Sequence, residues 1–405
     1  MDEAGEEITS GGMPSRAGRR RGRNDRLGAL GVAALVLAVV AAFTWTVQGR
    51  ATDTADARRS HVRTYYIAAD PVRWNYAPTG RNLITGKPFD DVAKVFTGSR
   101  PNRIGSTYQK SLYRAYTDAT FTHLAVRPAA WQHLGFLGPV IHAAVGDTVR
   151  IIFKNNLRRA ASIHMHGLRY DKASEGAPYN DGTTRAQHAD DAVPPGATYR
   201  YSYAVPERAG PGPMDPSSVM WMYHSHVDEV GDTNAGLIGP VIVTARNMAR
   251  EDGSPKDVDR ELVSVFQVSD ENRSLDLPAN EEKLAEPPAE DDDEFAESNL
   301  MHNINGYVFG NQPLGASPGE GMTVKAGQHV RWYLMSMGTE VDLHTPHWHG
   351  NTVVANGMRT DVVGLLPAQM ITADMIPDDP GTWLFHCHVN DHILAGMITR
   401  YQVVP

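Results

Sequence analysis

Two short histidine motifs occur twice in this sequence, in the same order. The repeated segments are IHMHG at residues 163–167 and WMYHSH at 221–226, then PHWHG at 346–350 and WLFHCH at 383–388. Both copies continue into an Ala-Gly pair followed by two apolar residues. Two motifs repeated in the same order predict two copies of one fold, each of ordinary domain size.

The chain beyond about residue 64 is rich in short β-type segments. Runs such as TVRIIF at residues 148–153 and GPVIV at 239–243 are bounded by Gly, Pro or Asn, without long helical periodicity. This pattern favours an all-β chain built from two β-sandwich domains. We place the domains at residues 62–250 and 258–405.

Acidic side chains outnumber basic ones, and the net charge of -9 argues against a nucleic-acid partner. Residues 279–298 are strongly acidic and contain prolines. That composition predicts a solvated loop inside the second half of the chain.

The amino-terminal residues predict a membrane anchor. Six arginines lie between residues 16 and 26, and residues 27–47 carry no charged side chain. An apolar stretch of this length can cross a hydrocarbon layer of roughly 30 Å, with the arginines held in the cytoplasm. We therefore expect a cytoplasmic tail at residues 1–26 and a single transmembrane anchor at 27–48, with the remaining chain outside the cell membrane. A cleaved signal peptide, which would give a secreted protein, is the alternative.

Four His-x-His pairs lie at equivalent places in the two repeats. They are His164/His166, His224/His226, His347/His349 and His386/His388. Residues two apart in a strand point to the same face, so each pair offers two imidazoles to one side of a sheet. Imidazole binds copper, zinc and iron. One such pair arises easily by chance, whereas eight imidazoles in equivalent pairs suit a cluster of three copper ions that binds dioxygen.

The single cysteine of the chain lies inside the fourth pair. Cys387 must point to the sheet face opposite His386 and His388. His392 and Met397 follow it five and ten residues later, and His344 lies just before the third pair. One Cys, two His and a Met form the ligand set of a blue copper electron-transfer centre. A buried cysteine that acts only as a small apolar residue is the alternative.

These motifs resemble those of the multicopper oxidases, and of ceruloplasmin-type members in particular. The similarity covers residues 64–405 and includes HTPHWHG at 344–350 and the segment from His386 to Met397. It implies two cupredoxin-like Greek-key domains that hold about four copper ions per chain. The implied ligands are His164 and His347 for type 2 copper; His166, His224, His226, His349, His386 and His388 for the type 3 pair; and His344, Cys387, His392 and Met397 for type 1 copper.

The same resemblance implies a laccase-like or ferroxidase-like oxidase. It would couple one-electron oxidation of a donor, either a metal ion such as Fe(II) or Cu(I) or a phenol, to four-electron reduction of dioxygen to water. Two-domain members imply a homotrimer with the cluster between neighbouring chains. A copper nitrite reductase and a non-catalytic copper electron-transfer protein are the alternatives.

The first repeat is expected to lack type 1 copper. The residues that correspond to the four type 1 ligands of the second repeat are Ala161, Ser225, Val230 and Leu237. None of these four offers a thiolate, an imidazole or a thioether.

Carboxylates near the predicted sites have candidate roles. Reduction of dioxygen consumes protons, which predicts acidic residues near the cluster. Asp181 resembles in position an acidic residue near type 2 copper in this family, although its Asp-Gly sequence also suits a turn. Asp391 precedes His392 and is the second catalytic candidate. Glu340 and Asp342, just before His344, could hold a metal-ion donor or be exposed strand residues.

Overall fold

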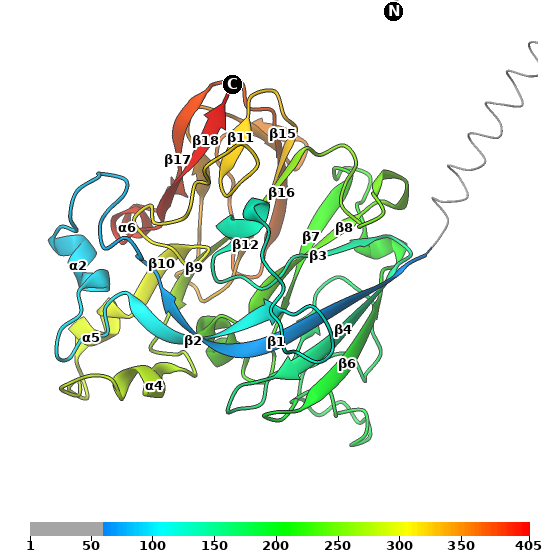
Figure 1. The fold of residues 1–405 in the computed structure, drawn as a ribbon, viewed down its shortest axis with the longest axis horizontal. Helices are drawn as coiled ribbons and strands as arrows, with labels where there is room; N and C mark the ends of the chain where they lie inside the picture. The colour runs from blue at the N-terminus through cyan, green and yellow to red at the C-terminus, as the bar shows by residue number, and fades with distance from the viewer. Residues whose placement is uncertain (1–59) are drawn as a thin grey trace, which may run out of the picture. The chain divides into compact units, whose positions relative to one another are not determined.

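The computed structural model describes residues 60–405. These residues form four β-sheets joined by loops and a few short helices (Figure 1). The prediction of a mostly β chain is confirmed for this region. The predicted tail at residues 1–26 and anchor at 27–48 lie outside the described residues. Within residues 60–405, no helix combines the length and apolarity needed to span a bilayer.

Eight strands from the first half of the described chain form two four-stranded sheets. Their orders are β2-β1-β4-β6 and β3-β8-β7-β5. In β4, buried Val149, Ile151 and Phe153 alternate with more exposed residues, because successive side chains of a strand point to opposite faces. The strands are β1 (Val62–Asn75), β2 (Thr107–Ala115), β3 (Ile141–Ala144), β4 (Thr148–Asn155), β5 (His164–Met165), β6 (Thr198–Ala204), β7 (Ser218–His224) and β8 (Ile238–Thr244).

Ten strands from the second half form the other two sheets, in the orders β10-β9-β12-β16-β14-β15 and β11-β18-β17-β13. All residues of β12 are buried, which explains its nearly continuous apolar sequence. The strands are β9 (Arg260–Asp270), β10 (Leu300–Ile304), β11 (Thr323–Lys325), β12 (Val330–Ser336), β13 (Pro346–Trp348), β14 (Val353–Ala355), β15 (Met358–Thr360), β16 (Met370–Met375), β17 (Gly381–Cys387) and β18 (Ile398–Val404).

The two sets of strands pair in the same order. β9 pairs antiparallel with β10 and parallel with β12, as β1 does with β2 and β4. The short β13 pairs with β17 as β5 pairs with β7, so His347 faces His386 where His164 faces His224. The histidine motifs therefore occupy equivalent strand positions in the two halves. The boundaries at residues 62–250 and 258–405 stay predictions.

Short helices occupy the connections between strands. They are α2 (Asp91–Thr97), α3 (Glu229–Ala235), α4 (Leu277–Glu281), α5 (Asp293–Ser298) and α6 (Asn390–Leu394), with 3-10 turns η1 (Ala129–Leu134), η2 (Glu207–Ala209) and η3 (Arg246–Met248). The acidic segment is therefore partly helical and not simply a solvated loop. Asp292 caps α5 by accepting the N–H of Phe295, and it also pairs with Arg103 at 2.8 Å. Phe295 is buried, which attaches this end of the segment to the protein.

A shared core joins the two sets of strands. It contains fully buried side chains from both, such as Met222 of β7, Val263 of β9 and Tyr333 of β12. An ion pair lies in the same region: Lys110 of β2 contacts Glu271, which follows β9, and neither side chain is exposed to solvent. Tyr76 donates to the same carboxylate at 2.6 Å. The interior between the two halves thus combines an apolar core with a buried pair of opposite charges.

Candidate metal centre

The residues predicted to bind type 1 copper meet at the carboxyl end of β17. The Sγ atom of Cys387 lies 3.5 Å from Nδ1 of His392 and 3.9 Å from Nδ1 of His344. These two nitrogens are 3.1 Å apart. Met397 is fully buried beside them, with its N–H bonded to the carbonyl of His392 and its carbonyl bonded to the N–H of Cys387. A thiol and two imidazoles this close together fit a single copper ion.

Local structure explains how these residues meet. β17 ends at Cys387, and the short helix α6 turns the chain so that His392 comes back over the sulfur. β13 runs antiparallel to β17, with Pro346 opposite Cys387. This pairing brings in the preceding residues, and the N–H of Thr345 donates to the sulfur at 3.4 Å.

Hydrogen bonds favour the charged form of the thiol. Burial raises the pKa of Cys387, but hydrogen bonds from His344, His392 and the Thr345 N–H outweigh that effect and lower the pKa to about 6. The thiolate, which is the metal-binding form, therefore predominates at neutral pH. Burial lowers the pKa of His344, but the hydrogen bonds to Asp342 and Cys387 more than offset burial, so that pKa is raised overall.

Asp342 lies beneath this centre and is only 1% exposed. Its Oδ1 atom lies 3.1 Å from Nε2 of His344 and accepts the N–H of Val268 at 2.6 Å, while Oδ2 accepts the N–H of Thr339 at 2.9 Å. A carboxylate placed this way orients the imidazole and makes it a stronger ligand. The suggestion that Asp342 holds a donor metal ion is therefore not supported by its position. Glu340 is exposed.

We expect Asp342→Asn to weaken copper binding at the Cys387 centre by about 10–100-fold, because His344 loses its charged hydrogen-bond partner. Titration of the blue absorption against a copper chelator measures this change. Glu340→Gln is the matched control, since it removes a nearby exposed carboxylate, and it is expected to leave copper affinity unchanged. Equal affinities for the two variants would contradict the assigned role of Asp342.

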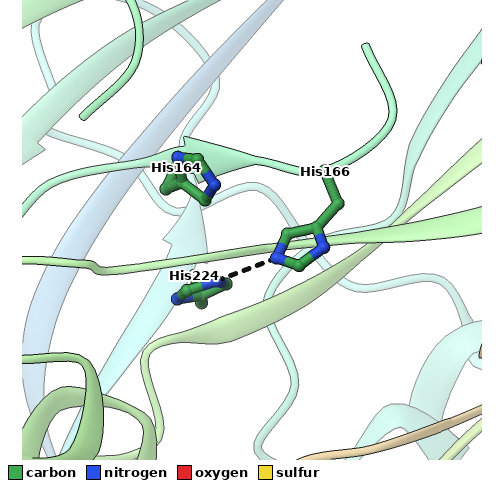
Figure 2. A group of neighbouring side chains, drawn as sticks. All are labelled: His164, His166 and His224. Atoms are coloured by element: carbon green, nitrogen blue, oxygen red, sulfur yellow. Dashed lines mark hydrogen bonds between the residues drawn. The ribbon is translucent and has the colours of Figure 1, made fainter. Parts of the chain in front are cut away.

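The first histidine group combines β5 and β7 of the first half. Figure 2 shows His164, His166 and His224 turned toward one another, with Nε2 of His166 and Nε2 of His224 3.0 Å apart. The ring of His226 lies 5.1 Å from that of His164. The pairing of β5 with β7 therefore brings together all four histidines that were predicted from the two motifs of this half.

The second histidine group has the same construction from β13 and β17. Nε2 of His386 lies 3.0 Å from Nε2 of His349 and 3.3 Å from Nδ1 of His347. The ring of His388 lies 5.2 Å from that of His347. His386 and His388 thus join the histidine group, while Cys387 between them joins the thiol centre, as the strand alternation predicts.

Both histidine groups contain imidazoles whose pKa values are lowered. Burial, together with neighbouring imidazoles, lowers the pKa of His166 to about 4 and that of His224 to about 3. Burial also lowers the pKa values of His349 and His386. Neutral imidazoles are the form that binds metals, so these rings need not lose protons at neutral pH.

The two histidine groups remain separate within one chain. Among residues 60–405, no ring contact or hydrogen bond joins a histidine of the first group to one of the second. Each group offers imidazoles around a space for metal, so the eight predicted ligands form two half-sites in the chain by itself.

The two predicted catalytic carboxylates lie outside these groups. Asp181 is paired with Lys172 at 2.9 Å and accepts a hydrogen bond from Thr183, and these two contacts lower its pKa. Its link to the histidines is indirect, since Lys172 also pairs with Glu175, whose carbonyl lies 2.7 Å from Nδ1 of His164. Asp391 is exposed on α6, one residue before His392.

The first half replaces the thiol centre with hydroxyl and carboxylate groups. The N–H of Ser162 donates to Oγ of Ser225 at 3.1 Å, just as the N–H of Thr345 donates to the sulfur of Cys387. Ser225 in turn donates to Asp232 at 2.6 Å. A polar network thus occupies the place where the second half has a thiol and two imidazoles.

The prediction that Val230 corresponds to His392 was wrong. The N–H of Met397 donates to the carbonyl of His392, and the equivalent N–H of Leu237 donates to the carbonyl of Asp232. Asp232 therefore takes the position of His392. The reason is that the loop after Ser225 is two residues longer than the loop after Cys387, which shifts the alignment.

One further histidine lies beside the thiol centre and was not among the predicted residues. The ring of His302, on β10, lies 5.3 Å from the ring of His392. It is half-buried, and burial together with the neighbouring His392 lowers its pKa to about 4. His302 lies in no His-x-His pair and is 90 residues from His392, so no local pattern pointed to it.

Comparison with protein families identifies the class to which this architecture belongs. Two family profiles, each described as multicopper oxidase, match residues 116–248 and 286–405, together more than half of the chain. The chain belongs to the multicopper oxidase family. The resemblance that the copper motifs suggested is confirmed, and copper is the metal that these groups fit.

Several curated relatives are similar over most of the chain. Hephaestin of Rattus norvegicus is 44% identical over 349 residues, which cover 84% of this chain and 29% of hephaestin. The ferroxidase HEPHL1 of Homo sapiens is 45% identical over 347 residues, with 84% and 29% covered. Ceruloplasmin of Mus musculus is 39% identical over 349 residues, with 85% and 32% covered. The chain thus spans about a third of the length of these relatives.

Solved structures share the cupredoxin-like β fold. A multicopper oxidase crystal structure has a TM-score of 0.51 at 19% identity, covering 85% of this chain and 89% of that one. A copper nitrite reductase from Nitrosomonas europaea has a TM-score of 0.52 at 16% identity, covering 85% and 94%. At these identities the likeness concerns the fold alone, and it does not distinguish an oxidase from a reductase.

Proposed function

We propose that this chain is a multicopper oxidase that carries about four copper ions and reduces dioxygen to water with electrons from a small donor. The observation that carries the proposal is the position of Cys387. Its thiol belongs to the centre with His344 and His392, while its neighbours His386 and His388 belong to a histidine group. Copper bound there would supply one-electron transfer at the thiolate and dioxygen reduction among the imidazoles.

The side chains at the thiol centre and in the histidine groups suit this reaction. Hydrogen bonds hold Cys387 as a thiolate, Asp342 orients His344, and the buried imidazoles are neutral. β17 then provides the shortest covalent route from the thiol centre to the histidine group that contains His386 and His388. Asp391, exposed beside His392, and Asp181, linked to His164 through Lys172 and Glu175, are the proposed carboxylates for proton delivery.

Fe(II) is the donor that we favour over Cu(I) and phenols. A relative of 45% identity carries the name ferroxidase. In this chain, half-buried His302 lies against His392, with 5.3 Å between the two ring centroids. An imidazole is a ligand that iron accepts, so His302 could hold a ferrous ion beside the electron-accepting ligand His392.

We expect His302→Phe to raise the KM for Fe(II) about tenfold while kcat and the blue absorption stay unchanged, because binding alone would be lost. Steady-state oxygen consumption with ferrous ion measures the change. A phenolic donor serves as the control and should show no shift in KM. An unchanged KM for Fe(II) would remove His302 from the donor site.

A homotrimer would complete the histidine cluster. The first group of one chain could meet the second group of its neighbour, which agrees with the separation of the two groups within a chain. A head-to-tail interface of this kind closes naturally into a ring. Dioxygen would then bind between chains, with three clusters in each trimer.

Mixed assemblies test this arrangement. We expect chains carrying His166→Ala and chains carrying His386→Ala to be inactive separately and to regain part of the activity when coexpressed. In a mixed trimer, one interface then joins the intact first group of a His386→Ala chain to the intact second group of a His166→Ala chain. Light scattering should give the mass of a trimer. If coexpression restores no activity and the protein is active as a monomer, the cluster does not form between chains.

The overall activity is tested with the copper-loaded chain. The proposal expects oxygen uptake in the ratio of one dioxygen to four ferrous ions, and about four copper ions per chain. Reduction of nitrite without oxygen uptake would instead favour the nitrite reductase alternative. Blue absorption without either activity would favour a non-catalytic electron-transfer protein.

We also propose that residues 27–48 anchor the protein in the cell membrane with its copper domains outside the cytoplasm. The uncharged stretch and the preceding arginines support this placement. Fractionation of cells should find the intact chain in the membrane. Release of a shortened chain into the medium would show that the segment is cleaved.

A further inference from the structure

A cavity of about 600 Å³ lies in the first half of the chain, away from the residues assigned to copper. One wall consists of β1 and β2, and the other of the segment from residue 124 to residue 142, which includes η1. Aromatic rings from Trp74, Tyr113, Trp131 and Phe136 line it. Its volume lies in the range of pockets that enclose small organic ligands.

Two arginines, Arg114 and Arg127, also line the cavity. Arg127 donates to the carbonyls of Gly135 at 2.6 Å and Leu137 at 2.7 Å, and no carboxylate of residues 60–405 pairs with it. Burial lowers the pKa of Arg127, and the charge of Arg114 lowers it further, so the two cations are close enough to repel. A half-buried cation bound only to carbonyls is costly, and an anion would offset that cost.

Arg114 is available for such an anion. Within the described part of the chain, its one carboxylate neighbour is Asp70, at the long distance of 3.9 Å, and its side chain is 40% exposed. Asp70 is already engaged by Tyr116 at 2.8 Å and Asn156 at 2.6 Å. Considering residues 60–405, the guanidinium of Arg114 therefore keeps unpaired donors at the same cavity that Arg127 lines.

The lip of the cavity is apolar. Leu124 is 39% exposed and Val126, one residue before Arg127, is 91% exposed. A free carboxylate or phosphate would gain nothing from such a surface, whereas a molecule with an apolar body would bury it. The apolar walls therefore favour a ligand with an apolar body, and the two arginines favour a negatively charged group at its end.

We propose that this cavity binds a small amphipathic organic anion, with its aromatic or aliphatic body among Trp74, Trp131 and Phe136 and its acidic group at Arg114 and Arg127. The site is separate from the copper groups, and the inference does not depend on the proposed oxidase activity.

The test uses two fluorescent probes of similar shape and different charge on the full chain. The anion is 1-anilinonaphthalene-8-sulfonate, and its neutral counterpart is N-phenyl-1-naphthylamine. We expect the anionic probe to bind once per chain, with quenching of tryptophan fluorescence, and to be displaced by decanoate. Arg114→Gln should weaken it about tenfold and leave the neutral probe unchanged, since one charge-assisted contact is lost.

Two further variants complete the design. Arg81→Gln, at an exposed arginine away from the cavity, is the matched control and should change neither probe. Ala125→Trp, which fills the cavity from its lip, should abolish binding of both probes without changing oxygen consumption. If Ala125→Trp fails to fold, the proposal is tested by the probe affinities of Arg114→Gln and Arg81→Gln and by displacement with decanoate.

Several results would overturn the proposal. These are equal effects of Arg114→Gln and Arg81→Gln, equal affinity for the charged and neutral probes, and undiminished binding to a folded Ala125→Trp variant. Probe binding that appears only after the assembly dissociates would show that a second copy of the chain covers the cavity instead.

Discussion

Replacing Cys387 with Ser is expected to abolish the blue thiolate-to-copper absorption and the oxidation of every donor. The variant removes the sulfur that lies 3.5 Å from His392 and 3.9 Å from His344, and a neutral hydroxyl is a poor copper ligand. The imidazoles of His386 and His388 remain, so most of the copper of the histidine cluster should still bind. Visible absorption, copper content and oxygen consumption measure the three effects.

Ser225→Ala is the matched control, because Ser225 occupies the equivalent position in the first half. It loses the hydrogen bond to Asp232 and the one from the Ser162 N–H, and should lower the free energy of unfolding by about 1–3 kcal/mol without changing colour or turnover. Full activity of Cys387→Ser would show that electrons do not pass through the thiolate. Loss of all copper from Cys387→Ser would show that the thiol centre and the histidine cluster bind metal as one unit.

Replacing Lys110 with Met is expected to lower the free energy of unfolding by about 3–5 kcal/mol. The change leaves the carboxylate of Glu271 fully buried without its cation, at the place where the two halves of the chain meet. Tyr76 and its hydrogen bond at 2.6 Å compensate only part of that charge. Denaturant unfolding of the purified chain measures the loss.

A second variant separates the buried charge from simple loss of packing. Lys110→Met combined with Glu271→Gln removes both charges and should recover most of the lost stability. Lys94→Met is the surface control, because Lys94 forms an exposed pair with Asp91, and it should change stability little. Equal losses for the single and double variants would contradict the buried-charge explanation.

The thiol centre was largely predictable because its candidate ligands follow local rules. Cys387 ends one strand, His392 lies in one short helix, and Met397 immediately precedes the next strand. The alternation of β17 alone decides that the sulfur and the two flanking imidazoles point to opposite faces. The four His-x-His pairs were predictable for the same reason, since a repeated motif at an equivalent strand position keeps its geometry.

The errors have a common physical origin. Asp342 and Asp232 are close in sequence to predicted ligands, but their burial and their partners depend on neighbouring strands and loop lengths. His302 on β10 reaches the thiol centre through a ring contact with His392 on α6, which is 90 residues away. The acidic segment is attached through Asp292 to Arg103, which is 189 residues away. Contacts of this kind carry no periodic signal.

The β class, the repeat, the grouping of histidines into pairs and the candidate ligands around Cys387 can all be read from the amino-acid sequence. These properties follow from side-chain type and from spacings of two to ten residues. Tertiary packing, by contrast, places Asp342 against His344 and His302 against His392, keeps the eight imidazoles in two separate groups, and sets two arginines at an apolar cavity. Such arrangements depend on which distant segments are buried against each other, and burial is a property of the whole fold.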